Sequence, residues 1–185
     1  GALGALDTRQ VRAIVDLIAG RRPVSATIGD CWDRPDVIPD RVACVAETGV
    51  DFVKVGVNLR HLDALCSPSV QRSTGSRCGL IVVCMAEQPP SVAAIKALKS
   101  PGIAGIMLDT ADKSGPPLTG LLSTSELKAF VDAGRQRELL TGLAGRLQVT
   151  DIPAVMSAGA DYIGFRTALC HRGQRAARCS PIAIE

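Results

Sequence analysis

Short runs of apolar and β-branched residues recur along the chain, and each is followed by a longer segment in which apolar positions return at helical spacing. This alternation is typical of parallel βα units, in which helices connect neighbouring strands of one sheet. The short runs predict six strands, at residues 24–28, 52–57, 80–85, 104–108, 139–143 and 162–165. The segments between them predict helices at residues 8–19, 38–48, 91–98, 123–136 and 152–157.

Local signals support several of the predicted helix ends. Ser123 and Glu126 stand at capping-box spacing ahead of an apolar-periodic segment, which predicts that a helix begins there. Gly20, Gly49 and Gly159 follow predicted helices, and glycine commonly ends a helix that precedes a strand.

The number of strands bears on the fold class. A (βα)8 TIM barrel takes eight strands and about 250 residues, whereas this chain of 185 residues predicts six strands and opens on a loop-like segment without an initiator methionine. We therefore predict a single barrel domain over residues 1–185, with about six βα units present and the N-terminal strands missing ahead of Gly1. An open, doubly wound α/β sheet of six strands is the alternative, although no GxGxxG or GxxxxGKS/T motif follows the first strand.

Lys54 is the most informative polar residue within a predicted strand. Strand alternation places Phe52, Lys54 and Gly56 on one face and the valines at 53, 55 and 57 on the other. The outer face of a barrel strand is covered by helices and favours the valines, so Lys54 is predicted to point inward. A buried ammonium is costly unless paired, and loss of solvent favours the neutral amine, which can act as a base or a nucleophile. A structural ion pair with Asp109 or Asp30 is the alternative.

Charged residues also follow the ends of predicted strands. The first strand is followed by Asp30, and the fourth by Asp109, with Lys113 four residues further on. Because the carboxyl ends of barrel strands carry the chemistry, these three residues join Lys54 as candidate site residues. Asp109 could instead cap the next helical turn, Asp30 could cap or orient its loop, and Lys113 could be a solvated surface lysine.

Glycine and arginine follow the last two predicted strands. Gly145 and Arg146 come after the fifth strand, and Gly164, Arg166 and Thr167 come at the end of the sixth. Many barrels build a phosphate site from backbone N–H groups after their last two strands, where glycine lets the backbone approach and arginine binds the anion bidentately. Gly145, Arg166 and Thr167 are therefore predicted to bind a phosphate. Surface arginines beside turn glycines are the alternative.

Composition narrows the function classes. Only five of the 21 basic residues are lysines, so each lysine position is informative. The net charge is +3, and one Trp, one Tyr and three Phe leave little to stack on nucleic-acid bases. No apolar stretch reaches the roughly 20 residues of a membrane span, and no export signal opens the chain. We expect a cytoplasmic protein that binds neither membranes nor nucleic acid.

The seven cysteines form no CxxC pair and lie partly within apolar runs. This is typical of reduced, buried thiols in a cytosolic protein, and only His61 and His171 could join them around a metal. We expect no disulfide framework and no metal. We also expect a homo-oligomer that acts on a small phosphorylated carbonyl compound.

Five segments, taken together, carry a specific family resemblance. They are residues 24–30 (VSATIGD), 49–56 (GVDFVKVG), 107–113 (MLDTADK), 143–145 (LAG) and 159–166 (GADYIGFR). Through them the chain resembles the (5-formylfuran-3-yl)methyl phosphate synthase family from Gly1 to about Arg175. That family is a barrel lyase that condenses two molecules of glyceraldehyde 3-phosphate, with loss of phosphate and water, to the furan precursor of methanofuran and related C1 carriers.

The resemblance implies roles for individual residues. The family's proton-accepting lysine falls on Lys54, and further catalytic residues fall on Asp109 and Lys113. Its Schiff-base lysine lies in an Asp-x-Lys-x-Pro strand end that is expected upstream of Gly1 and not in this sequence. No metal or organic cofactor is implied.

Two departures and two alternatives accompany the resemblance. Arg146 stands where the family has a small residue and Thr167 where it has a glycine, and both touch the predicted phosphate loops. The alternatives are another Schiff-base barrel aldolase that acts on a sugar phosphate, and a barrel that binds a phosphate ligand without turnover.

Overall fold

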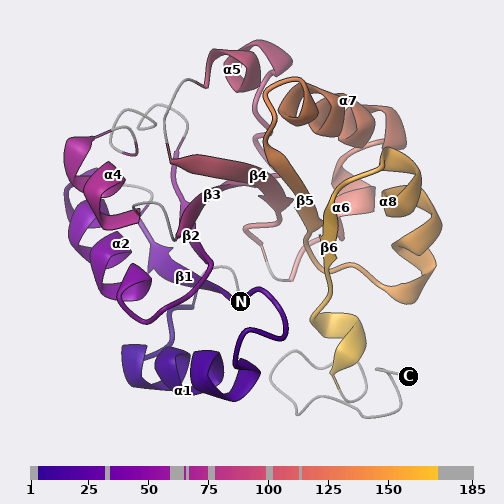
Figure 1. Cartoon of the computed structure of the whole chain (residues 1–185). Coiled ribbons are helices and arrows are strands. Elements are labelled where there is room, and N and C mark those ends of the chain that lie inside the picture. Colours follow the sequence, from indigo (N-terminus) through magenta and orange to yellow (C-terminus); the bar gives the residue numbers. More distant parts are fainter. Residues whose placement is uncertain are drawn as a thin grey trace. The chain divides into compact units, whose positions relative to one another are not determined.

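The computed structural model describes residues 4–31, 34–58, 65, 67–74, 78–98, 102–112 and 114–170 (Figure 1). Its strands are β1 (Ser25–Asp30), β2 (Phe52–Gly56), β3 (Gly79–Met85), β4 (Ile103–Asp109), β5 (Leu140–Ala144) and β6 (Tyr162–Gly164). Its α-helices are α1 (Thr8–Ile18), α2 (Ile38–Ala46), α4 (Pro68–Thr74), α5 (Val92–Ala97), α6 (Leu118–Leu121), α7 (Thr124–Arg135) and α8 (Ile152–Ala158). Short 3-10 turns occur at η1 (Pro35–Val37), η3 (Val149–Asp151) and η4 (Thr167–Leu169).

The predicted alternation of strands and helices is confirmed. All six predicted strands and all five predicted helices are present, with small differences at their ends. The capping box is confirmed as well: Glu126 accepts a hydrogen bond from the N–H of Ser123 at 2.8 Å, and the Ser123 hydroxyl accepts one from the N–H of Glu126 at 3.3 Å. Helices α4 and α6 were not predicted, because α4 is mostly polar in sequence and α6 has only four residues.

The strand order decides between the two predicted folds. Six parallel strands follow one another in the order β1-β2-β3-β4-β5-β6, so each strand lies next to its neighbour in sequence. A doubly wound sheet reverses its strand order at one point, whereas a βα barrel runs in sequential order. The order therefore contradicts the doubly wound alternative and agrees with barrel-type βα units. Further strands ahead of Gly1 remain a prediction.

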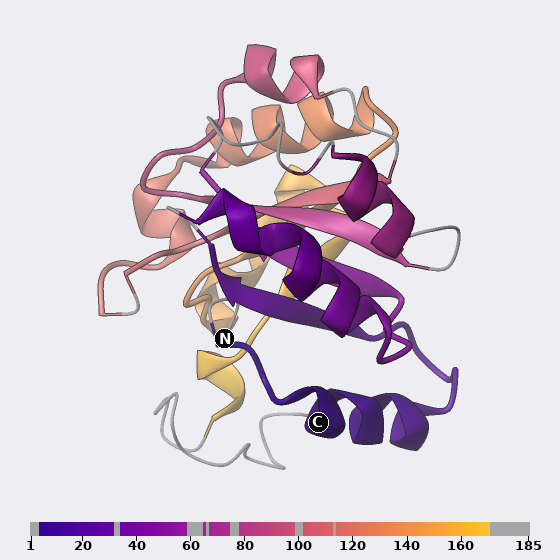
Figure 2. The ribbon, with the colours of Figure 1, turned by 90° about the vertical axis from the view of Figure 1, so that its left-hand side faces the viewer.

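The described chain forms two compact units, of which the first comprises Gly1–Cys84 and Leu98–Ile106. Within it, α2 packs against β1 and β2, and α4 packs beside α2 (Figure 2). The apolar residues of α2 recur at helical spacing, and Ile38, Val42 and Val45 are all buried. Full burial of such a side chain contributes roughly 1.5–3 kcal/mol, so this apolar face holds α2 on the strands.

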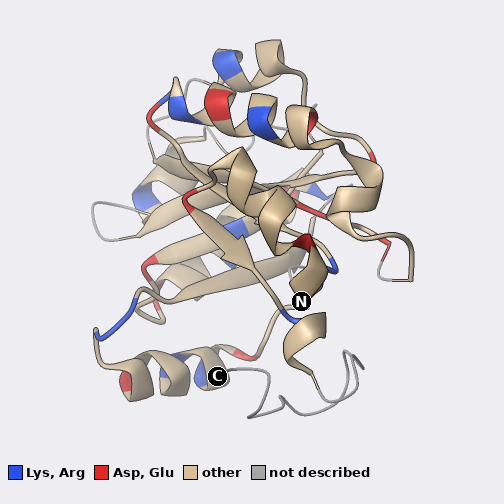
Figure 3. Cartoon of the chain, turned by 90° about the vertical axis from the view of Figure 1, so that its right-hand side faces the viewer, with Lys and Arg blue, Asp and Glu red and all other residues tan. Residues whose placement is uncertain are grey.

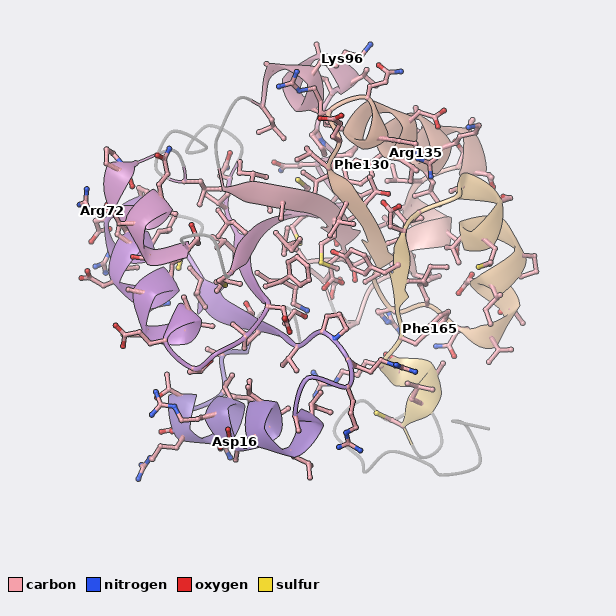
Figure 4. The ribbon with its side chains drawn as sticks, in the orientation of Figure 1. Asp16, Arg72, Lys96, Phe130, Arg135 and Phe165 are labelled. Atoms are coloured by element: carbon pink, nitrogen blue, oxygen red, sulfur yellow. The ribbon has the colours of Figure 1, made fainter. Side chains whose placement is uncertain are left out.

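The second unit comprises Met85–Ala97 and Met107–Glu185. Here α7 packs against β5, α5 and α8. Leu127, Phe130 and Val131 are buried on one side of α7, and Figure 4 shows Phe130 on the side that faces β5. The outer side of α7 carries charges of both signs (Figure 3), including an exposed ion pair of 2.9 Å between Lys128 and Asp132.

The same hydrogen bond to an aspartate occurs at the start of β2 in one unit and at the start of β6 in the other. The N–H of Val24 donates to Asp51 at 2.7 Å, and the N–H of Thr141 donates to Asp161 at 2.7 Å. Both aspartates return a backbone hydrogen bond of 2.9 Å to the same residue. The segments 49–56 and 159–166 are thus two copies of one local structure, each beginning with a glycine at positive φ.

Candidate active site

β2 places Lys54 on the face opposite its valines, as predicted from strand alternation. Val53 and Val55 are 0% exposed, whereas Lys54 is half-buried. Lys54 lies in register with Thr27 of β1 and Ile81 of β3, so it occupies an interior strand of the sheet. Lys54 is therefore partly shielded from solvent, while the helix-covered face of β2 is left to the valines.

Asp30 is the last residue of β1 and lies in register with Gly56, two residues beyond Lys54 on β2. The register of β1 shifts between Thr27 and Asp30, and Gly29 within that shift has a φ of 84°. The backbone of Asp30 thus lies at the carboxyl end of the strand, as predicted. The side chain of Asp30 and the whole of Lys113 lie outside the described part of the chain.

Asp109 ends β4 and is only 6% exposed. Its carboxylate accepts the N–H of Thr110 at 2.8 Å, and its carbonyl accepts the N–H of Ala86 at 2.8 Å. The first described helix after β4 is α6, whose N-cap is Pro117. Asp109 therefore does not cap that helix.

Gly145 follows β5 and approaches the loop after β4 very closely. Its φ is 118°, and a Cβ atom there would lie 2.7 Å from Cγ2 and 2.9 Å from the backbone N of Thr110. Its carbonyl accepts the N–H of Leu118 at 2.9 Å. The glycine is thus required by contact with Thr110, a reason that the sequence had not suggested.

Arg146, the first departure from the family pattern, also has a left-handed backbone, with a φ of 51°. It lies near Asp112 in the loop after β4. The hydroxyl and N–H of Ser114, followed by the more distant charge of Arg146, hold the pKa of Asp112 below its usual value. Arg146 therefore adds positive charge beside the predicted phosphate loop.

The carboxyl ends of β5 and β6 lie side by side, because Ala144 is in register with Gly164. A Cβ atom on Gly164 would lie 3.0 Å from that of Ala144. Arg166 follows two residues later, beyond Phe165 at the end of β6 (Figure 4), and is exposed. Thr167 begins η4. The second unit thus brings together the segments that carry Asp109, Gly145 and Arg166.

The structure reveals two polar residues that the sequence analysis passed over. Tyr162 lies across Gly142 of β5, and its hydroxyl is buried with no hydrogen-bond partner among the described residues. Glu87, two residues past the end of β3, accepts backbone N–H groups of the loop after β4. An acidic residue just after a predicted strand was the signal that also marked Asp30 and Asp109, so Glu87 could have been found from sequence.

His61 and His171, which could join cysteines around a metal, both lie outside the part of the chain that the structure describes, so the absence of a metal stays a prediction. Within the described part, no group of three His, Cys, Asp or Glu side chains is arranged to hold a metal ion. Cys78 and Cys84 are buried thiols, and Cys44 is an exposed one. Burial raises the pKa of the Cys84 thiol to about 12, so this thiol stays protonated at neutral pH. Across the described ranges, no helix is long and apolar enough to cross a membrane.

Solved structures with the same fold are aldolases and related enzymes. A Coccidioides immitis protein, described as a candidate deoxyribose-phosphate aldolase, matches with a TM-score of 0.64 and 16% identity over 85% of this chain and 66% of that one. The aldolase QR15 matches with a TM-score of 0.60 and 15% identity over 85% of this chain and 73% of that one. The likeness shows that the chain has the βα fold shared by these aldolase-like structures.

Sequence comparison defines the family. The whole chain, residues 1–185, matches the 4-HFC-P synthase family, and the protein belongs to it. A Methylorubrum extorquens relative, described as a candidate (5-formylfuran-3-yl)methyl phosphate synthase, is 39% identical over 95% of this chain and 72% of its own length. The (5-formylfuran-3-yl)methyl phosphate synthase of Methanopyrus kandleri is 35% identical over 95% of this chain and 78% of its own. The protein is thus an enzyme of the synthase or lyase kind.

Proposed function

We propose that this protein condenses two molecules of glyceraldehyde 3-phosphate, with loss of phosphate and water, to a furan aldehyde phosphate used for methanofuran-type C1 carriers. The observation that carries this proposal is the family match over the whole chain. Relatives that bear the synthase name, and the aldolase-like fold, support the same reaction class.

In this proposal the carbon–carbon bond forms by aldolase-like chemistry. A lysine upstream of Gly1 condenses with the carbonyl of one triose, and the resulting imine acidifies the neighbouring carbon. Lys54 accepts the proton from that carbon as the second aldehyde adds. Its partly buried position on an interior strand supports this role, because reduced solvation favours the neutral amine.

The remaining candidates hold charges and the phosphate groups. Asp109 and Lys113 complete the catalytic set. In this proposal the carboxylate of the buried Asp109 holds Lys54 or Lys113 in the charge state that the reaction needs. Gly145, Arg166 and Thr167 bind a substrate phosphate at the adjacent ends of β5 and β6, and Asp30 contributes at the end of β1. Charge-assisted hydrogen bonds from an arginine suit a phosphate, because the guanidinium presents two parallel donors.

The test is a product assay on the complete protein. Supplied with glyceraldehyde 3-phosphate alone, it is expected to release inorganic phosphate and form a furan aldehyde phosphate, detected by ultraviolet absorbance and mass spectrometry. Borohydride added during turnover is expected to trap one triose on a lysine. If neither the furan nor the trapped adduct forms, the proposal is overturned.

A second candidate function is that of a Schiff-base aldolase acting on a sugar phosphate, favoured by the structural likeness to aldolases. The same assay separates the two, because an aldolase would join two molecules of glyceraldehyde 3-phosphate into a sugar phosphate, without release of phosphate and without a furan chromophore. A protein that only binds a phosphate ligand would give no borohydride adduct at all.

A further inference from the structure

The loop after β4 is held by carboxylates at consecutive backbone positions. Asp109 accepts the N–H of Thr110 at 2.8 Å. Glu87 accepts the N–H of Ala111 at 2.9 Å through Oε1 and at 3.1 Å through Oε2, and it accepts the N–H of Asp112 at 3.1 Å through Oε1. Three successive N–H groups of this loop are therefore bound by two carboxylates rather than by other backbone groups.

Glu87 is the one of these two acceptors that comes from outside the loop. It follows β3, and its neighbour Ala86 donates its N–H to the carbonyl of Asp109 at 2.8 Å. The segment 86–87 therefore contacts the loop at Asp109 and again at Ala111 and Asp112. Because hydrogen bonds to a charged acceptor are stronger than neutral ones, the carboxylate fixes the loop more firmly than a backbone carbonyl could.

The same loop also supports the glycine turn after β5. Thr110 lies against Gly145 so closely that no side chain fits at Gly145. A displacement of Thr110 would therefore shift the turn at Gly145 as well.

We propose that Glu87 is a positioning residue that fixes the loop carrying Asp109 and continuing to Lys113, so that the proton-transfer step is made in the right geometry. This inference rests on the proposed function for its catalytic consequence. Glu87 touches the backbone of the loop and acts through it. Displacements near 1 Å at a reacting centre can cost on the order of 100-fold in rate, so a modest loosening of the loop is sufficient to matter.

Two substitutions and one matched control test the proposal in the complete protein. Glu87→Ala removes every hydrogen bond between the Glu87 side chain and the loop. Glu87→Gln keeps one carbonyl oxygen that can take the place of Oε1 and accept both N–H groups. Glu126→Ala is the control, because Glu126 also accepts a backbone N–H, but at the start of α7. Amide hydrogen exchange at residues 110–112 is measured without substrate, and kcat and KM are measured with glyceraldehyde 3-phosphate.

The expected result separates positioning from general destabilisation. Glu87→Ala should speed exchange at Ala111 and Asp112 by about 10-fold or more and lower kcat by on the order of 10- to 100-fold, with a much smaller change in KM. Glu87→Gln should recover much of both losses. Glu126→Ala should leave the exchange of the loop unchanged and kcat within about 2-fold of the unsubstituted protein.

Two results would overturn the inference. One is unchanged exchange at Ala111 and Asp112 in Glu87→Ala, and the other is faster exchange with an undiminished kcat. The exchange measurement needs no substrate, so it tests the contact between Glu87 and the loop independently of the reaction. Absence of a furan product from the unsubstituted protein would instead count against the proposed function.

Discussion

The hydroxyl of Tyr162 is buried and has no hydrogen-bond partner among the described residues. The ring lies across Gly142, so close that a Cβ atom there would overlap the ring. In the other copy of the same local structure the equivalent residue is Phe52, which packs against Gly79 without a hydroxyl. Burial, with a smaller contribution from Asp161, raises the pKa of Tyr162 from 10.0 to about 12. The phenol is therefore neutral at physiological pH.

Tyr162→Phe is expected to keep or raise the free energy of unfolding, by on the order of 1 kcal/mol, since a buried hydroxyl without a partner carries a desolvation cost. The raised pKa adds a pH dependence. Ionisation of Tyr162 does not change the free energy of unfolding below pH 10, and it lowers this free energy as the pH rises towards 12. Chemical denaturation across this range should show a smaller alkaline loss in the variant. A clear loss of stability at pH 7 would show that the hydroxyl does have a partner.

Arg166→Ala is expected to raise KM for a phosphorylated triose by roughly 10- to 100-fold, because a charge-assisted contact to phosphate is worth about 1.5–3 kcal/mol. Arg135→Ala is a suitable control. Arg135 donates to the carbonyl of Gly159 at 2.7 Å between α7 and α8, at the amino ends of β5 and β6 rather than at their carboxyl ends. If KM is unchanged and only thermal stability falls, Arg166 is a structural residue and the phosphate site lies elsewhere.

Single residues were predictable from sequence where the signal was local. The face of Lys54 follows from alternation along one strand, and the structure confirms its half-buried position opposite buried valines. The place of Glu87 just after a strand was visible in the sequence, but its contacts, like those of Tyr162, are made with residues far away in sequence, so no local pattern could reveal them. The contact that requires Gly145 is of the same kind, because Thr110 belongs to another strand end.

Among the elements, the starts of β2 and β6 are fixed by aspartates that bind the preceding strand. Asp161 accepts both the N–H and the hydroxyl of Thr141 at 2.7 Å, and Thr141 is fully buried. The two hydrogen bonds from Thr141 are the main reason why the pKa of Asp161 is lowered. The contact replaces water for two polar groups that burial would otherwise leave unsatisfied.

Asp161→Ala is expected to lower the free energy of unfolding by about 1 kcal/mol, a value reduced to allow for solvent around the exposed carboxylate. Because the pKa is lowered in the folded protein, the stabilisation is present above the unfolded value near 4 and fades as the pH falls through the folded value. The difference between the two proteins should therefore shrink in acid. Asp132→Ala, which removes only an exposed ion pair, should change stability little, and an equal loss there would contradict the account.

Apolar periodicity predicted the elements whose stability comes from an apolar face. The six strands and the helix α7 were found in this way. Helix α4 was missed because Val70 is the only apolar side chain among its buried residues, and it is held by packing beside α2 instead. Its position is a tertiary effect that a local pattern does not carry.

At the scale of the whole molecule, the sequential strand order shows the fold, and the family match shows the kind of enzyme. The strand order excludes the doubly wound sheet, and the aldolase-like structures show the fold. The chain spans 72% and 78% of the length of the two curated relatives described above. The central claim is that Lys54 works as a base in this enzyme and is not merely one half of a static ion pair.

The turnover number of Lys54→Arg in the complete protein tests that claim most directly. Arginine keeps the positive charge and can form an ion pair, but it does not lose its proton at accessible pH. We expect Lys54→Arg to fold with near-normal thermal stability and to lose kcat on glyceraldehyde 3-phosphate by on the order of 100-fold or more, the usual scale of general-base catalysis. Lys128→Arg, on the exposed side of α7, should retain full turnover. A Lys54→Arg protein that keeps most of its kcat would show that this position needs only positive charge, and would contradict the role assigned to Lys54.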